Sequence, residues 1–130
     1  MIIDIATLTG SCVVALGKYT SGVMGNDDGL IRQVEQAAKV SGEKVWHMPS
    51  GGDYLEEMKS KIADLKNVGS RWGGACTGAS FLGEFVGETK WAHIDMAGVE
   101  MFAEPKQGGV GSRGYGVRLL TSLVQNIKKK

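Results

Sequence analysis

The sequence predicts an α/β fold, a three-layer sandwich in which helices cover both faces of a largely parallel central sheet. Three observations support this prediction. Short apolar segments rich in strand-forming residues alternate along the chain with segments of helical periodicity. A length of 130 residues suffices for one hydrophobic core. The 20 glycines, about twice the average share of ~7%, imply many tight turns or close backbone approaches.

The composition argues against several classes of partner. The chain is 42% hydrophobic and 22% charged with a net charge of +1, so it has no electrostatic field that would attract nucleic acid or an anionic membrane. No apolar run approaches the ~20 residues that cross a bilayer. Cys12 and Cys76 both lie among small apolar residues, which is typical of buried free thiols in a reducing compartment. We therefore expect a cytoplasmic protein that binds neither nucleic acid nor a membrane.

The first strand leads directly into a candidate ligand site. Residues 2–6 form a β-branched apolar run that predicts a strand buried on both faces. Thr7, Thr9 and Gly10 follow at once, and ligands of open α/β sheets gather beyond the carboxyl ends of the strands. An ordinary turn after a buried strand is the simpler interpretation. Because a central strand needs neighbours on both sides, we expect the chain to be a partial domain whose unpaired edge favours association.

The next segments alternate between strands and helices. Residues 11–16 suit either a helical turn or a second buried segment, and residues 20–25 suit a short strand. The most regular pattern follows, a helix capped by Asn26 or Asp27 and ended by Gly42. Its apolar face consists of Leu30, Ile31, Val34, Ala37 and Ala38.

The middle of the chain has weaker signals. Residues 45–48 suit a brief extended segment before Pro49. Asp53 caps an expected helix whose apolar positions are Tyr54, Leu55, Met58 and Ile62. Residues 63–67 suit a further strand.

The last third contains the second strong strand. Residues 77–86 predict a helix with small residues in its first turns and Gly87 at its end. Residues 91–97 alternate as a strand, and residues 98–116 read as a glycine-rich loop. We expect a final helix over residues 117–128, with an inner face of Val117, Leu120, Val124 and Ile127.

Several motifs fail on inspection. Residues 10–18 resemble a phosphate loop, but the glycine spacing is two residues too long. Residues 109–114 match the dinucleotide fingerprint without the preceding strand or the acidic partner that it needs. A nucleotide-binding module is therefore a distant third possibility.

Polar residues inside the apolar strands suggest internal pairing more than catalysis. His93 and Asp95 share one face of a strand, as two metal ligands would, but no third ligand accompanies them. A hydrogen-bonded core histidine is the better interpretation. Asp4 and Asp64 also need partners if they are buried. No Ser/His/Asp or Cys/His arrangement follows from the spacing.

Six segments, in this order and spacing, resemble the leucyl (cytosol) aminopeptidase family. They are IDIATLTG (3–10), VALGKYTSGVMGN (14–26), SGEKVW (41–46), KSKIADLKNVG (59–69), GGACTGASFLGEFV (73–86) and WAHIDMAG (91–98). The resemblance implies a two-metal exopeptidase that removes N-terminal residues from peptides, with zinc or manganese as the metal. It also implies a cytosolic homo-oligomer, a hexamer.

The resemblance places the catalytic machinery outside this sequence. The family's metal ligands and its catalytic lysine and arginine lie upstream, the last of them in an Asn-Thr-Asp-Ala-Glu-Gly-Arg motif that is absent here. Residues 1–130 then correspond to the C-terminal portion of a metallo-aminopeptidase catalytic domain. We expect no catalytic residue, no bound metal and no activity of the isolated chain.

What this portion supplies, by resemblance, is the wall of the substrate pocket. Thr7, Gly10, Ala97 and Glu100 would line the pocket for the first side chain, and the backbone around Leu8 and Gly10 would hydrogen-bond the peptide. Glu100 stands where family members have an apolar residue, which suggests tolerance of a basic or polar first residue. The alternative function is that of a non-catalytic, shortened relative that acts as a binding or assembly module.

Overall fold

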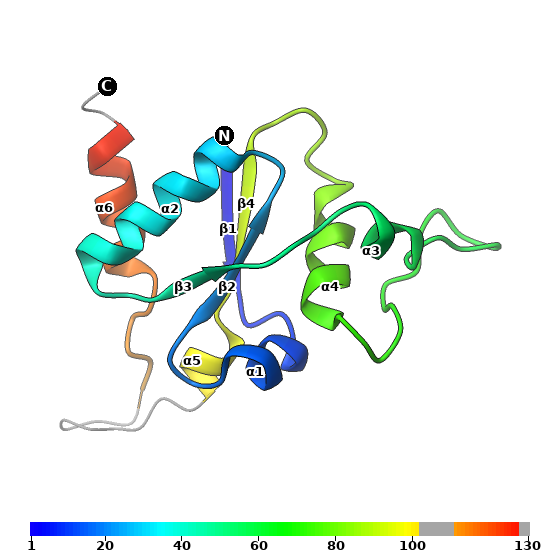
Figure 1. Cartoon of the computed structure of the whole chain (residues 1–130), viewed down its shortest axis with the longest axis horizontal. Coiled ribbons are helices and arrows are strands. Elements are labelled where there is room, and N and C mark those ends of the chain that lie inside the picture. Colours follow the sequence, from blue (N-terminus) through cyan, green and yellow to red (C-terminus); the bar gives the residue numbers. More distant parts are fainter. Residues whose placement is uncertain (102–110, 128–130) are drawn as a thin grey trace.

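The computed structural model describes residues 1–101 and 111–127, which form a four-stranded sheet between two layers of helices (Figure 1). The strand order is β1 (Ile2–Ala6), β4 (Trp91–Asp95), β2 (Ser21–Gly25) and β3 (Val45–His47). β1 pairs with β4 and β2 with β3 in parallel, whereas β2 and β4 are antiparallel. The predicted α/β class with a largely parallel sheet is confirmed.

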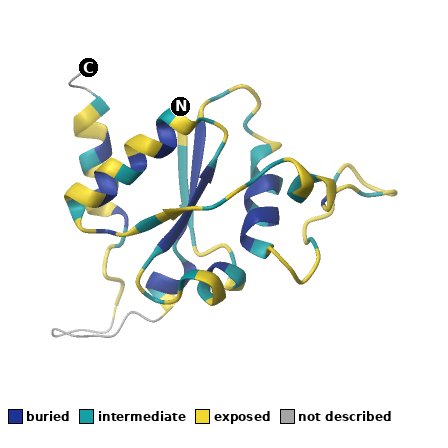
Figure 2. Cartoon of the chain, in the orientation of Figure 1, coloured by how far each residue is buried: buried dark blue, intermediate teal, exposed yellow. Residues whose placement is uncertain are grey.

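The helices divide between the two faces and one end of the sheet. α2 (Asp28–Ser41) and α6 (Val117–Ile127) cover one face, and α4 (Gly74–Gly83) with the short α3 (Asp53–Glu56) lies on the other (Figure 1). α1 (Gly10–Leu16) and α5 (Ala97–Met101) pack together at the end where β1 and β4 finish. The larger apolar cluster joins the sheet to α2 and α6, and the smaller one joins Met24 and Trp91 to Ala79 of α4. In Figure 2 the buried residues concentrate along β2 and β4 and on the sheet-facing sides of α2 and α4.

α2 forms as its sequence predicts. The Asp27 side chain accepts a hydrogen bond of 2.7 Å from the amide of Leu30, which caps the first turn. Gly42 ends the helix in the left-handed conformation with φ +74°. All five apolar positions named from the periodicity are buried.

β1 is an edge strand and none of its residues is fully buried, so the expectations of a central strand and of one buried on both faces are wrong for this chain. It pairs with β4 alone among the described residues, and Ile2 is 41% exposed. The interior positions belong to β4 and β2, and all five residues of β4 are buried. An apolar run shows that a strand contacts the core, but its place in the sheet depends on pairing with distant segments.

The segment from residue 53 to residue 67 also differs from expectation. The helix stops at Glu56, its N-cap is Gly52 instead of Asp53, and Ile62 is 98% exposed. Residues 63–67 form no strand, and only an isolated bridge joins Lys59 to Leu65. Asp64 is exposed and therefore needs no buried partner. Most of the segment that follows α3, at the right of Figure 1, is exposed.

Three further differences concern helices. α4 begins and ends about three residues earlier than predicted. The strand predicted over residues 91–97 ends at Asp95, and residues 97–101 form α5, where the sequence suggested the end of that strand and the start of a loop. Residues 102–110 of the predicted loop lie outside the described residues. α6 buries Leu119 and Leu123, whereas Val117 and Val124 of the expected inner face are exposed. Leu120 and Ile127 do pack against the core, as expected.

His93 is the hydrogen-bonded core histidine that the sequence favours. It is fully buried, and its Nδ1 lies 2.5 Å from the Asp4 carboxylate on the adjacent strand. The indole Nε1 of Trp91 donates to the other oxygen of Asp4 at 2.5 Å. Asp4 thus joins β1 to β4 through two side chains at once. The free thiols of Cys12 and Cys76 are also buried, as predicted.

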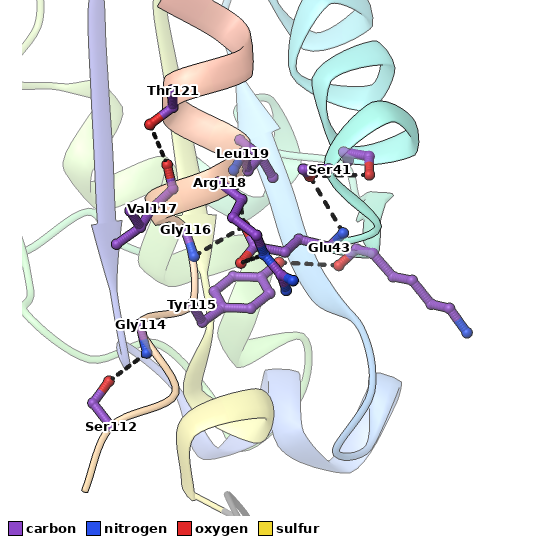
Figure 3. A network of polar contacts seen from close by, with 12 residues as sticks. Ser41, Glu43, Ser112, Gly114, Tyr115, Gly116, Val117, Arg118, Leu119 and Thr121 are labelled. Carbon is purple, nitrogen blue, oxygen red and sulfur yellow. Dashed lines mark hydrogen bonds and ion pairs between the residues drawn. The ribbon is translucent and has the colours of Figure 1, made fainter.

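A buried carboxylate fixes the start of α6. Glu43, which follows α2, is 4% exposed and accepts hydrogen bonds from the amides of Gly116 at 3.1 Å and Leu119 at 2.9 Å (Figure 3). Its other oxygen lies 3.4 Å from Nε of Arg118. The side chain therefore serves as a cap supplied from a distant loop, since it satisfies amides that the first helical turn leaves unpaired.

Candidate functional site

The carboxyl ends of β1 and β4 meet at Asp95. Asp95 lies opposite Ala6 in the parallel ladder and is fully buried. Its Oδ1 accepts hydrogen bonds from the amides of Leu8 and Ala97, each at 3.2 Å. Its Oδ2 accepts one of 2.7 Å from the hydroxyl of Thr9. One carboxylate therefore sets the path of the chain after both strands.

The same turn starts α1. The Thr9 hydroxyl accepts a hydrogen bond of 3.0 Å from the amide of Cys12, so Thr9 is the N-cap of the helix. The Cys12 thiol lies 3.5 Å from the carbonyl of Asp95. Burial and, to a smaller extent, the neighbouring Asp95 carboxylate raise the pKa of this thiol to about 11. Cys12 is therefore a packing residue and not a thiolate nucleophile.

A first cavity of about 460 Å³ opens beside this turn. Its walls come from the turn, from α1 and from one face of α5. The lining residues are Thr7, Thr9, Gly10, Val13, Ala97, Glu100 and Met101. The structure thus brings together four residues named from the sequence, two after β1 and two in α5.

Leu8, the fifth residue named from the sequence, lines a different space. A second cavity of about 390 Å³ lies between the turn, α4 and residues 67–71. Apart from Leu8 and Thr9 it is lined by Ser11, Met58, Asn67, Val68, Gly69, Ser70, Arg71, Gly74, Thr77, Gly78, Phe81 and Leu82. The turn from Thr7 to Gly10 therefore contributes to both of these cavities.

Sequence reasoning missed Asp95 as the organiser of the site. The available signal was a carboxylate at the last position of a buried strand, where it must find donors. Its partners, however, belong to a turn more than 80 residues away along the chain. Spacing alone could not identify them.

The described residues do not by themselves form a metal centre. Across residues 1–101 and 111–127, no three or more His, Cys, Asp or Glu side chains gather closely enough to hold an ion. In the same part of the chain, no helix has the length and apolar character that crossing a bilayer requires. What these residues offer is two neighbouring cavities around a fixed turn.

Fold and cavities together define an α/β domain with a candidate binding site beyond two parallel strands. A model of the catalytic domain of the cytosol aminopeptidase family matches residues 1–121. The chain is 49% identical over 128 residues to a probable cytosol aminopeptidase from Chloroherpeton thalassium. This alignment covers 98% of the present chain and 25% of the relative. Identity is 52% over 125 residues with a probable cytosol aminopeptidase from Trichormus variabilis, with coverage of 95% and 25%.

A solved structure agrees with these relatives. A mutant of tomato leucine aminopeptidase matches with a TM-score of 0.88 and 46% identity, over 96% of this chain and 24% of that one. The chain belongs to the cytosol aminopeptidase family, as the six segments indicated. It spans about a quarter of the length of the relatives that it matches.

Proposed function

We propose that this chain is part of a two-metal aminopeptidase that hydrolyses N-terminal residues from peptides, and that it supplies walls of the substrate pocket. One observation carries the proposal beyond family membership. Thr7, Gly10, Ala97 and Glu100, which the family resemblance assigns to the pocket for the first side chain, line a single cavity.

The turn after β1 is suited to hold a peptide backbone. Asp95 holds the turn through its hydrogen bonds to Leu8 and Thr9. Because the turn is already ordered, ligand binding there costs little additional conformational entropy. The amide of Leu8 is already bonded to Asp95, so contact between the peptide and Leu8 falls to the Leu8 carbonyl. A peptide lying along the turn would place neighbouring side chains in the two cavities.

Hydrolytic chemistry does not come from the residues described here. The family resemblance assigns it to two divalent ions, zinc or manganese, held by residues that this sequence lacks. We therefore expect the 130-residue chain on its own to take up no stoichiometric metal and to hydrolyse no peptide. We further propose that the complete protein is cytoplasmic and forms a hexamer.

The test uses the complete protein that contains this sequence, and the variant Gly10→Ala. A Cβ at Gly10 would have no atom within 4 Å, so the substitution fits the fold and adds a methyl group beside the first cavity. We expect KM for leucine anilide to rise about tenfold, the usual effect of one misplaced methyl group in a specificity pocket. Val40→Ala, on the exposed surface of α2, should leave KM unchanged.

Two results would contradict the proposal. An unchanged KM in Gly10→Ala would remove the turn from the substrate pocket. A complete protein that hydrolyses no aminoacyl substrate with added zinc or manganese would favour the alternative, a non-catalytic binding or assembly module.

A further inference from the structure

Among the described residues that line the first cavity, Glu100 is the only charged one. α5 presents Ala97, Glu100 and Met101 to the cavity, which are positions i, i+3 and i+4 on one face of a helix. The remaining walls are two threonines, a glycine and Val13. The part of the lining that the structure describes is therefore largely apolar, with Glu100 as its one charged residue.

The Glu100 carboxylate is held in place by residues of the segment that precedes α6. Its Oε1 accepts hydrogen bonds from the amide of Tyr115 and the hydroxyl of Ser112, each at 3.3 Å. Neither donor brings a positive charge. No Lys or Arg within residues 1–101 and 111–127 forms an ion pair with Glu100, and no donor in those ranges bonds to its Oε2.

The Glu43 network makes this support rigid. The Tyr115 hydroxyl donates to the carbonyl of Lys44 at 3.0 Å, and the next amide, that of Gly116, donates to Glu43 (Figure 3). The amide that binds Glu100 thus lies on a segment anchored at two points. A carboxylate oriented in this way is preorganised for a cation instead of being free to turn into solvent.

We propose that Glu100 selects peptides whose N-terminal residue is lysine or arginine. The inference rests on the proposed function and deepens it by naming the substrate class. The methylene stem of such a side chain packs against Val13, Ala97 and Met101, while its charged end donates to Glu100. Neutral residues of similar length fill the same space without that charge-assisted bond.

The experiment compares kcat/KM of the complete protein on four aminoacyl anilides, those of lysine, arginine, norleucine and leucine. Norleucine matches the lysine stem without its charge. Glu100→Gln preserves the shape of the side chain and removes the negative charge. We expect the lysine-to-norleucine ratio of kcat/KM to fall about 10-fold or more, the range of a hydrogen bond to a charged group.

Two further variants sharpen the comparison. Ser112→Ala removes one of the two donors that the described residues supply to Glu100, so the ratio should fall by less than in Glu100→Gln. Glu88→Gln makes the same chemical change at an exposed carboxylate between α4 and β4, and it should leave the ratio unchanged.

The outcomes distinguish a failure of this inference from a failure of the proposed aminopeptidase function. If Glu100→Gln leaves the lysine-to-norleucine ratio unchanged while all four substrates are hydrolysed, the selectivity is overturned and the proposed aminopeptidase function stands. An equal fall for all four substrates also overturns it, because the carboxylate would then act on a group that every substrate shares. A wild-type protein that hydrolyses none of the four overturns the proposed function and this inference with it.

Discussion

The Thr9 hydroxyl donates a hydrogen bond of 2.7 Å to the carboxylate of Asp95, 86 residues further along the chain. The same hydroxyl accepts the amide of Cys12 and so caps α1. One side chain therefore connects the end of β4, the turn after β1 and the first turn of a helix. Both cavities are built around this connection.

Thr9→Ala should lower the free energy of unfolding by about 2 kcal/mol, because it removes a helix cap and leaves one oxygen of a buried carboxylate without its donor. Thr9→Ser keeps the hydroxyl and should lose less than half of that amount. Urea unfolding of both variants measures the difference. Equal losses would show that the Thr9 methyl group, and not its hydroxyl, stabilises the turn.

Asp4→Ala should be more costly, at about 2–5 kcal/mol. The substitution leaves the ring of His93 and the indole nitrogen of Trp91 without their acceptor, and both side chains are buried. Unfolding in urea, followed by tryptophan fluorescence, measures the loss. Asp64→Ala, at an exposed carboxylate, is the control and should change stability by less than about 0.5 kcal/mol. A similar loss in both variants would refute the role given to Asp4.

Sequence patterns predicted the elements that local chemistry determines. α2 combines a capping aspartate, a continuous apolar face and a glycine at its end, and each of these acts within one or two turns. The segment after Asp53 lacks such agreement. There the Ser60 hydroxyl accepts the amides of Ile62 and Ala63, and this local bonding competes with a helix.

Where the sequence pattern allowed two different faces of a helix to be buried, only tertiary packing determined which one is buried. The last helix has apolar residues on two adjoining sides, and packing against α2 buries Leu119 and Leu123 completely but the predicted stripe only in part. The edge position of β1 has the same origin, since pairing partners are distant in sequence. The same holds for the candidate site. The sequence pattern predicted the turn after β1, but it did not predict that the Asp95 carboxylate positions this turn.

Stability should fall with rising pH between about pH 9 and pH 12. Burial raises the pKa of the Cys12 thiol from 9.0 to about 11, and burial raises the pKa of the Tyr115 hydroxyl from 10.0 to about 12. In each case the unfolded chain loses its proton first, so above its ordinary pKa the unfolded state binds fewer protons than the folded state. The contribution of Cys12 is complete below pH 9 and declines until about pH 11, by at most roughly 1.4 kcal/mol per pH unit.

Urea unfolding across this pH range measures how steeply the free energy of unfolding falls with pH. Two variants separate the contributions of Cys12 and Tyr115 to that slope. Cys12→Ala should flatten the decline between pH 9 and 11, and Tyr115→Phe should flatten it between pH 10 and 12. Absolute stability will also change in both variants, so the slopes are the quantities to compare. A wild-type slope of zero from pH 9 to 11 would mean that the thiol ionises as readily in the folded protein as in the unfolded chain.

Gly98→Ala should destabilise the protein by about 3 kcal/mol, because α5 packs onto the end of α1 with no space for a side chain. A Cβ at Gly98 would lie 2.0 Å from the carbonyl oxygen of Gly17, and this contact is with backbone, which cannot turn aside as a flexible side chain would. Gly10→Ala is a matched control in the first turn of the partner helix, where no atom lies within 4 Å of the added carbon. It should be neutral or stabilising by up to about 1 kcal/mol, since alanine is the better helix former. Thermal unfolding of both variants measures the contrast, and equal midpoints would refute the close packing of α5 on α1 that forms one wall of the first cavity.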